Sequence, residues 1–327
     1  MILSKAPVRL SMGGGGTDLP SYYKEYGGFL LATSINKFVY ILLNRRFEDN
    51  YRLSYSKTEI VNEIDEIEHP IFRESMKYVK LDSKVEIVSV ADVPSNCGLG
   101  TSSTFTVALL NALYAYQRNY IGIDKLAEAA CHIEIDVLKE PIGKQDQYAS
   151  AYGGFNAYYF EKDGTVKVEP LRIKEEMMIE LQNNIFLFYL NKHRSASSIL
   201  TDQNEKSKKK DTSTLDKLHK IKEIGLHTKK ILEQGRINEF GEVLHNHWLT
   251  KKGLSDKISD PYIDEAYDVA LKNGAIGGKV VGAGGGGFLL VYCPNNKTRL
   301  VDALRNFGLK PTWFSFEFDG AKKVFSA

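Results

Sequence analysis

A loop rich in glycine and hydroxyl residues, DVPSNCGLGTSSTF at 92–105, constrains the fold of this chain more than any other feature. It lies between KVEIVSV (84–90), which predicts a strand, and ALLNALYAY (108–116), which predicts a helix. A strand, a glycine loop and a helix in this order direct backbone N–H groups and the positive helix end at one point. The pattern therefore predicts an anion site, with phosphate as the candidate ligand. The hydroxyls of residues 101–103 are alternatively helix caps, and we expect at least one of them to cap.

Two further stretches are rich in glycine, KAPVRLSMGGGGTDLP (5–20) and GGKVVGAGGGGFLL (277–290). Clustered glycines let the backbone reach positive φ and approach a ligand closely. Each stretch alone is equally compatible with a flexible turn.

Neither common nucleotide motif is present in the third stretch. The Gly-Lys pair at 278–279 does not end a Walker loop, because Asn273 stands where its first glycine belongs and Val280 replaces the required Ser or Thr. The spacing G-x-G-x-x-G does occur at 282–287. That fingerprint needs a helix after it, however, and FLLVY (288–292) predicts a strand.

The composition excludes several classes of partner. With 43 basic and 41 acidic residues the net charge is +2, which gives no electrostatic case for nucleic acid or an anionic membrane. No run approaches the roughly 20 apolar residues of a membrane span, and the N-terminal apolar stretch is too short for a signal peptide. The three cysteines match neither a disulfide framework nor a zinc motif. We expect a soluble, cytoplasmic protein with reduced thiols.

The order of elements predicts an α+β fold, because strands and helices are mixed without the alternation of a doubly wound sheet. A chain of 327 residues suffices for two domains. Helices are expected at 102–117, at 124–140 and over much of 215–272, whereas the polar segment 201–217 predicts a solvated loop or helix end. The predicted strands are 38–43, 51–55, 84–90, 155–160, 185–190, 288–292 and 313–318.

Two carboxylates are candidates for chemistry beside the predicted phosphate site. Magnesium carried by a nucleotide prefers oxygen ligands, and Glu134 lies next to the apolar side of the 124–140 helix. The alternative for a single helical glutamate is a solvated face. Asp146 follows a glycine turn in IGKQDQYAS (142–150), a setting that can hold a carboxylate to orient a nucleophile or accept its proton. Spacing alone does not assign that role.

Together these segments resemble the GHMP kinases, the family named for galactokinase, homoserine kinase, mevalonate kinase and phosphomevalonate kinase. All three glycine-rich motifs occur in the family's order, so the resemblance spans nearly the whole chain. The first and third motifs, with GKQDQYASAYGGF (143–155), look most like the D-glycero-D-manno-heptose 7-phosphate kinases of the family. The most specific match is to P-x-x-x-G-L-G-[ST]-S, which is met by Pro94, Gly98, Leu99, Gly100, Thr101 and Ser102.

This resemblance implies the fold and the reaction. The fold would be a two-domain GHMP kinase fold, with an N-terminal α/β domain at 1–180 and a C-terminal ferredoxin-like domain at 181–327. The reaction would be ATP-dependent phosphorylation of the anomeric hydroxyl of the heptose 7-phosphate to the 1,7-bisphosphate, for bacterial surface heptose. Mg²⁺ would accompany ATP. The partner would be a small sugar phosphate, without nucleic acid or membrane, and the oligomeric state stays open between monomer and homodimer.

The resemblance also implies roles for individual residues. Asp146 would be the base and Arg9 the basic residue beside the reacting oxygen. Magnesium would be held through Ser102 and Glu134, and the turn 282–287 would buttress the phosphate loop. The residues implied for ATP are Pro94, Gly98, Leu99, Gly100, Thr101, Ser102 and Ser103, and those implied for the sugar are Gly16, Thr17 and Asp18.

The acceptor is suggested by a departure from the galactokinases. They carry Glu-His before the Thr-Asp pair, whereas this chain has Gly15 and Gly16, which argues against galactose and leaves room for a bulkier sugar.

An acceptor that already bears phosphate needs its own cation. His193 and Arg194 follow the predicted strand 185–190, and Arg194 suits bidentate phosphate contact. A solvated rim is an equal alternative there, and Lys251 and Lys252 are weaker candidates for the clamp.

Two other functions remain open. One is another small-molecule kinase of the family, acting on fucose or a different sugar. The other is a non-catalytic relative that binds nucleotide or sugar. The joint presence of Asp146, Glu134 and Ser102 argues against the second, because a binding module does not need a base.

Overall fold

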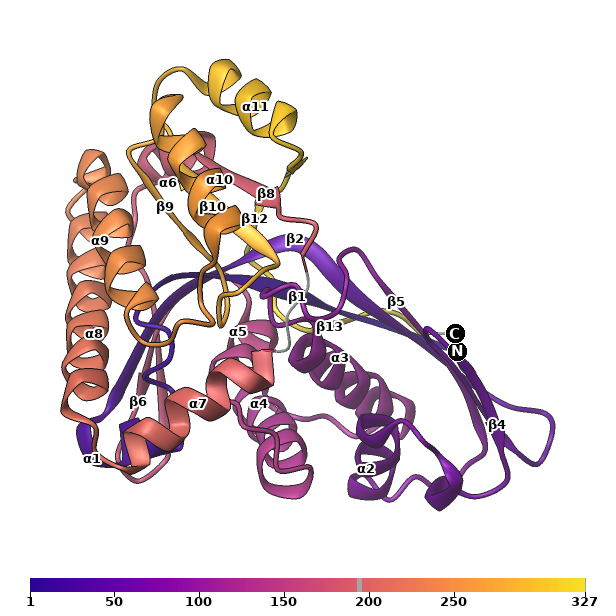
Figure 1. Cartoon of the computed structure of the whole chain (residues 1–327). Helices are drawn as coiled ribbons and strands as arrows, with labels where there is room; N and C mark the ends of the chain where they lie inside the picture. Colours follow the sequence, from indigo (N-terminus) through magenta and orange to yellow (C-terminus); the bar gives the residue numbers. More distant parts are fainter. Residues whose placement is uncertain (193–195, 327) are drawn as a thin grey trace.

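The computed structural model describes residues 1–192 and 196–326 (Figure 1). Within them a nine-stranded sheet has the order β13-β1-β2-β5-β3-β4, while β6 and β12 also pair with β2, and β7 pairs with β6. The length of β2 explains this branching, because its 18 residues pair with β6 at one end and with β5 at the other. The strands are β1 (Ile2–Gly13), β2 (Gly28–Arg45), β3 (Tyr51–Ser54), β4 (Thr58–Val61), β5 (Val85–Ala91), β6 (Phe155–Phe160), β7 (Val166–Pro170), β12 (Phe316–Glu317) and β13 (Lys322–Ser326).

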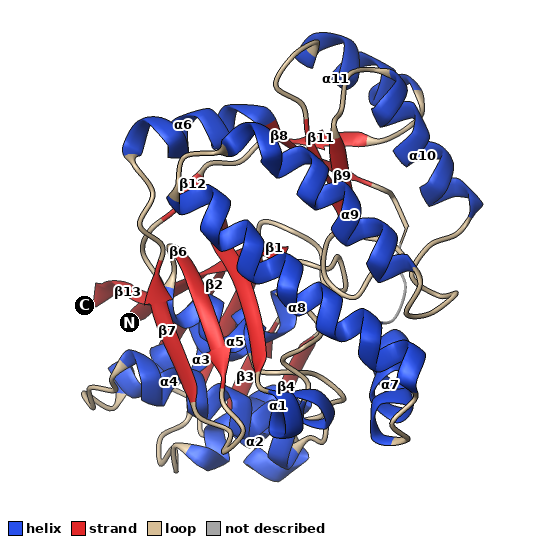
Figure 2. Cartoon of the chain, turned by 90° about the vertical axis from the view of Figure 1, so that its left-hand side faces the viewer, coloured by secondary structure: helices blue, strands red, loops and turns tan. Residues whose placement is uncertain are grey.

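Both faces of the centre of this sheet are covered. Side chains alternate along a strand, so on β2 Leu30 and Ala32 join one apolar core, whereas Phe29 and Leu31 join another. The first core is shared with α3 (Thr101–Tyr116) and α5 (Gln145–Tyr152), and the second with α8 (Thr212–Glu233). Figure 2 shows α8 crossing one face of the sheet, with α3 behind it.

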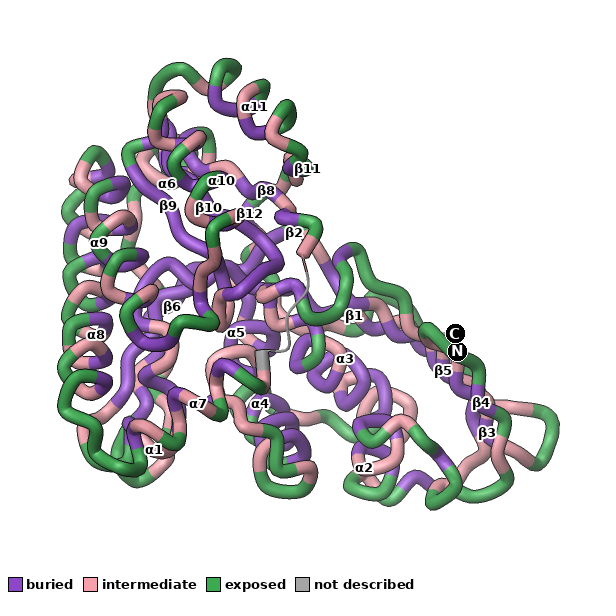
Figure 3. The backbone as a smooth tube through the Cα atoms, viewed as in Figure 1, coloured by how far each residue is buried: buried purple, intermediate pink, exposed green. Residues whose placement is uncertain are grey.

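A second sheet of four strands has the order β11-β8-β10-β9, and all of its pairs are antiparallel. Along the chain β8 precedes α8, α9 (Phe240–Lys252) and α10 (Pro261–Lys272), and α11 (Lys297–Asn306) connects β10 to β11. This is the βαββαβ order of a ferredoxin-like unit, which confirms the predicted fold of this part. The strands are β8 (Ile185–Tyr189), β9 (Gly277–Val280), β10 (Phe288–Tyr292) and β11 (Lys310–Thr312). In Figure 3 the buried backbone runs through β9 and β6, and the outer side of α11 is exposed.

The end of the chain returns to the first sheet. Strands β12 and β13 pair with β2 and β1, so residues 316–326 lie with the N-terminal sheet. The division at residue 181 stays a prediction. The predicted strand 313–318 is short, since only Phe316 and Glu317 pair with β2.

Two predicted helical boundaries differ from the structure. The helix expected at 124–140 is α4 (Ile123–Cys131) followed by a π-helix at His132–Val137. The polar segment 201–217 lies largely in α7 (Ala196–Lys208) and at the start of α8. Polar side chains of α7, Gln203 and Ser207, are buried on the same face as Ile199, so an apolar pattern could not predict this helix.

The remaining helices are α1 (Pro20–Tyr26), α2 (Pro70–Tyr78) and α6 (Glu175–Asn184), with 3₁₀ turns at Ile64–Glu66 and Ile237–Glu239. Among the helices described, none has the length and apolar character needed to cross a membrane. Cys97, Cys131 and Cys293 are all buried and free.

Candidate active site

The first turn of α3 carries no side-chain cap. Its N-cap residue is Gly100, in the left-handed region at φ 77°, and no side chain accepts a capping hydrogen bond from the first-turn amides. The expectation that a hydroxyl of residues 101–103 caps this helix is therefore wrong. Thr101 instead donates to the carbonyl oxygen of Pro94 at 3.2 Å. The leading amides of α3 thus lack a side-chain acceptor and border an open cavity, as an anion site requires.

The loop before α3 is held by backbone contacts from two distant segments. The Arg9 amide on β1 donates to the Leu99 carbonyl oxygen at 3.2 Å. From the other side, the turn after β9 packs on Gly98, where an added Cβ would lie 2.5 Å from the Val281 carbonyl oxygen. Gly98 and Gly282 both have positive φ, 82° and 72°. Only glycine allows this approach, which fits the buttress predicted for the third glycine stretch.

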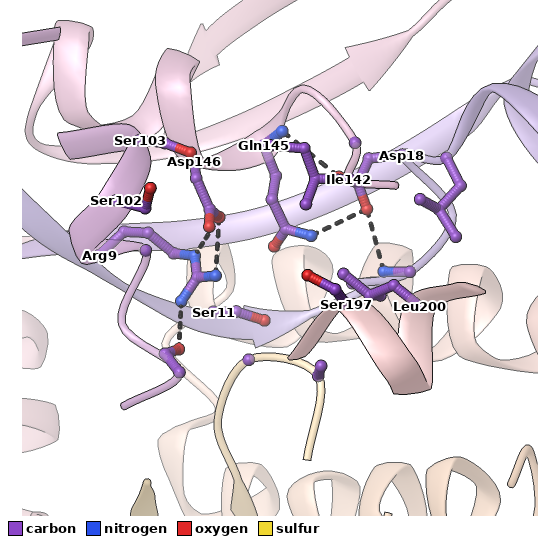
Figure 4. Close-up of a pocket in the computed structure, with 18 of the residues that line it drawn as sticks. Arg9, Ser11, Asp18, Ser102, Ser103, Ile142, Gln145, Asp146, Ser197 and Leu200 are labelled. Atoms are coloured by element: carbon purple, nitrogen blue, oxygen red, sulfur yellow. Dashed lines mark hydrogen bonds and ion pairs between the residues drawn. The ribbon is translucent and has the colours of Figure 1, made fainter. Parts of the chain in front are cut away.

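Asp146 lies against this loop. A Cβ on Gly100 would be 2.9 Å from the Asp146 carboxyl carbon, so the carboxylate touches the helix entrance. Arg9 donates from Nε to Asp146 Oδ1 at 2.8 Å, and Nη2 is 2.7 Å from the same oxygen. Nη1 of Arg9 donates to the Gly98 carbonyl oxygen at 2.7 Å. Figure 4 shows this pair beside Ser102 and Ser103. The structure therefore brings Asp146, Arg9 and the head of α3 together.

Glu134 is buried, with 1% of its surface exposed, so the alternative of a solvated face is wrong. It projects from the π-helix, a distortion that is frequent at functional sites. Gln147 Nε2 donates to Glu134 Oε2 at 2.6 Å and to Ser103 Oγ at 3.2 Å. Burial raises the pKa of Glu134 to about 7. No cluster of three or more His, Cys, Asp or Glu side chains suited to a metal occurs in the described part of the chain, so Glu134 would need ligands of another kind.

Asp18 lies on the other side of Asp146. Gln145 donates to it from Nε2 at 2.9 Å and from its amide at 3.3 Å. Burial, and then the nearby Asp146 charge, raise the pKa of Asp18. Thr17 differs, because it is fully buried and its hydroxyl lies 2.8 Å from the carbonyl oxygens of Gly14 and Phe29. It does not line the cavity, and its observed contacts are those of a residue that holds the loop.

One cavity of about 290 Å³ joins these groups. Of the predicted ATP residues, Pro94 and Leu99 do not line it. The predicted residues that do are Arg9, Gly16, Asp18, Gly98, Gly100, Thr101, Ser102, Ser103, Glu134 and Asp146. The sequence reasoning did not identify Ser11, Gln145, Gln203, His247 and Lys279 as lining residues. Alternation along β1 could have indicated Ser11, which shares the face of Arg9.

The structure describes only some of the residues predicted to bind the acceptor's phosphate. His193 and Arg194 lie outside the described residues. Lys192 pairs with Asp260, and Lys252 pairs with Asp264 at 2.9 Å. Lys251, predicted as a weaker candidate, lines the cavity.

Comparison with known proteins places the chain in a family. The GHMP kinase N-terminal domain matches residues 66–154, and the GHMP kinase C-terminal domain matches residues 228–310. The chain is 31% identical to D-glycero-alpha-D-manno-heptose 7-phosphate kinase of Campylobacter jejuni, over 98% of each protein. It is 24% identical to the L-fucokinase/L-fucose-1-P guanylyltransferase of Bacteroides fragilis, over 88% of this chain and 34% of that protein.

A solved structure extends the likeness over the whole fold. The D-glycero-D-manno-heptose 1-phosphate kinase of Bacteroides thetaiotaomicron superposes with a TM-score of 0.82 at 29% identity, covering 100% of both chains. Since the two domain matches follow each other in order and the heptose kinase of Campylobacter jejuni matches from end to end, this chain belongs to the GHMP kinase family.

Proposed function

We propose that this protein is an ATP-dependent sugar-phosphate kinase that phosphorylates the anomeric hydroxyl of D-glycero-D-manno-heptose 7-phosphate. The observation that carries the proposal is the Asp146–Arg9 pair at the uncapped head of α3, within one cavity. The relative from Campylobacter jejuni, which is named for this sugar phosphate, supports the choice of acceptor.

The residues divide the work of phosphoryl transfer between them. The leading amides of α3 bind the ATP phosphates, and the helix dipole favours their negative charge. Asp146 orients the acceptor hydroxyl and accepts its proton as the oxygen bonds to the γ-phosphorus and the bond to ADP breaks. Arg9 fixes the Asp146 carboxylate and offsets charge on the transferred group.

Glu134 and Ser102 fit a magnesium ion that arrives with ATP. A buried carboxylate whose pKa is raised to about 7 lacks a compensating cation, and a divalent ion would favour its charged form. Ser102 lines the cavity and is exposed, so its oxygen is accessible. The ion would neutralise the charge of the β and γ phosphates.

The acceptor site would lie around Asp18 and Gln145, which line the cavity next to Asp146. Gly15 and Gly16, which line the cavity, have no side chains where galactokinases carry Glu-His, and this difference favours a sugar other than galactose. The names of the two heptose kinases differ in the position of the phosphate that the acceptor already carries, carbon 7 or carbon 1. The site of transfer must therefore be measured.

The test is a panel of acceptors with ATP and Mg²⁺, followed by ³¹P NMR of the product. We expect heptose 7-phosphate to gain a second phosphate on carbon 1. Transfer only to fucose or another free sugar would favour a different kinase of the family. Absence of ADP release with every acceptor would favour the non-catalytic alternative. The cytoplasmic location and the choice between monomer and homodimer stay predictions.

A further inference from the structure

Three basic side chains of the second sheet and α9 enter the cavity beside Arg9. They are His247 and Lys251 on α9 and Lys279 on β9, and we call them the basic cluster. Only 1% of His247, 8% of Lys251 and 1% of Lys279 is exposed. All three line the cavity that holds Asp146. Cationic side chains are seldom buried to this extent unless they are paired.

The two lysines have neutral partners. Lys279 Nζ lies 3.2 Å from Ser11 Oγ, and Lys251 Nζ donates to the carbonyl oxygen of Val280 at 3.1 Å and to that of Gly282. Within the described part of the chain, neither ammonium forms an ion pair with a carboxylate. Arg9, a cation outside the cluster that lines the same cavity, already has Asp146 as its counter-charge. The basic cluster therefore gathers three basic groups in a buried space without a matching anion, an arrangement that would be stabilised by a bound anion.

His247 supplies an independent sign of a missing ligand. Both of its ring nitrogens are buried, and neither has a hydrogen-bond partner among the residues described. The great majority of buried polar groups in proteins have a hydrogen-bond partner. An imidazole without one at a cavity wall therefore points to a ligand that would supply the missing hydrogen bond. The lysines and this imidazole, which come from α9 and β9, would together supply donors to an oxyanion.

We propose that His247, Lys251 and Lys279, with Ser11, form a buried subsite for a phosphate group, separate from the amides at the head of α3. The cluster comes from the ferredoxin-like unit, whereas the α3 site comes from the N-terminal sheet, and Arg9 borders both. Its occupant is either the acceptor's own phosphate or the phosphate being transferred. That choice rests on the proposed function, but the existence of a phosphate subsite does not.

The charge state of the empty cluster supports this assignment. Burial, and then Arg9, lower the pKa of Lys251 to about 7. Burial, followed by Lys251 and Arg9, also lowers the pKa of Lys279 well below its ordinary value. The pKa of His247 is lowered well below its ordinary value by burial, and then by Lys279 and Lys251. A bound dianion would reverse these shifts, so binding at neutral pH should be accompanied by proton uptake.

The test compares Lys279→Met with Lys252→Met by isothermal titration calorimetry. Lys252 is the neighbour of Lys251, pairs with Asp264 and does not line the cavity, so its variant removes the same charge elsewhere. Four probes are used, namely inorganic phosphate, heptose 7-phosphate, unphosphorylated heptose, and a non-hydrolysable ATP analogue with Mg²⁺. We expect Lys279→Met to lower the affinity for inorganic phosphate at least tenfold and Lys252→Met to change that affinity less than twofold. In the wild type, two buffers of different ionisation enthalpy should reveal the proton uptake.

The pattern of losses identifies the source of the phosphate. If Lys279→Met loses affinity for heptose 7-phosphate but not for the ATP analogue or free heptose, the subsite binds the acceptor's phosphate. If it loses affinity for the ATP analogue but not for heptose 7-phosphate, the subsite binds the phosphate that is transferred. If Lys279→Met and Lys251→Met bind every phosphate probe as the Lys252→Met control does, the subsite does not exist.

A second measurement excludes a purely structural role. Because Lys279 is buried without a counter-charge, Lys279→Met should raise the melting temperature of the ligand-free protein and abolish its further rise with phosphate. A lower melting temperature together with unchanged phosphate affinity would mean that Lys279 is structural. If heptose 7-phosphate neither binds nor reacts while inorganic phosphate still depends on Lys279, the proposed function fails and the subsite stands.

Discussion

Replacing Asp146 by Asn tests the proposed base most directly, because it removes the charge and keeps the shape. The Asn oxygen can still accept from Arg9, which now bonds to Asp146 Oδ1 at 2.8 Å. A hydrogen bond to a charged group contributes about 1.5–3 kcal/mol and a neutral one about 0.5–1.5 kcal/mol. The Asp146 side chain is 22% exposed. We therefore expect the free energy of unfolding to fall by only about 1–2 kcal/mol.

The loss of turnover should be much larger. A positioned acid or base contributes about 10²–10⁴ in rate, which corresponds to about 3–5 kcal/mol of activation free energy. ADP release at saturating ATP and heptose 7-phosphate would measure this loss, and calorimetry with an ATP analogue would measure nucleotide binding. We expect nucleotide affinity within about threefold of the wild type, since the amides of α3 are unchanged.

Asp136→Asn is the matched control. Asp136 lies on the same π-helix as Glu134, but its side chain is 66% exposed and its partner is His132. Its replacement should alter turnover less than twofold. Turnover of Asp146→Asn within tenfold of the wild type would refute the role of Asp146. An equal loss of nucleotide affinity and turnover would show that Asp146 supports the loop instead of the reaction.

Four further variants test the site. Burial raises the folded-state pKa of Glu134 from 4.5 to about 7, so its ionisation costs stability as the pH rises through this range. In chemical denaturation, Glu134→Gln should therefore be more stable than the wild type by up to about 3 kcal/mol at pH 8 and equal to it near pH 4. A difference that is the same at all pH values would contradict this. Thr17→Val should lower the free energy of unfolding by about 1–3 kcal/mol and leave the KM for the sugar nearly unchanged. Asp18→Asn should instead raise that KM. Thermal melts measure the first effect, and steady-state kinetics measures the second. Gly98→Ala should weaken binding of the ATP analogue at least tenfold, because its Cβ would lie 2.5 Å from the Val281 carbonyl oxygen; normal binding would show that the turn after β9 does not support the loop.

Local patterns predicted much of the fold. Runs of β-branched and aromatic residues predicted β5, β6, β8 and β10 nearly to the residue, because each strand has an apolar face that must be buried. β1 was missed as a strand, although it is central to the sheet, because its sequence was interpreted as a glycine motif. The helix α7 was also missed, since part of its buried face is polar.

The candidate site was only partly predictable. The glycine loop at the head of α3 follows from neighbouring residues, although a side-chain cap was wrongly expected there, and the family resemblance implied Asp146, Arg9 and Glu134. Lys279 was considered only as part of a failed Walker motif. Its Nζ lies near Ser11, which is 268 positions earlier in the chain, and no local pattern connects the two.

The sequence by itself predicted an anion-binding loop between a strand and a helix, and its resemblance to the GHMP kinases implied a ferredoxin-like second half and membership of that family. These conclusions depend on contacts within a few residues or on whole motifs. The tertiary structure decided that Arg9 joins Asp146 to Gly98, that Thr17 holds a loop, and that the basic cluster enters the same cavity. These features arise where β1, α5, α9 and β9 meet, and such contacts depend on how the two sheets pack and not on the order of residues in any one segment.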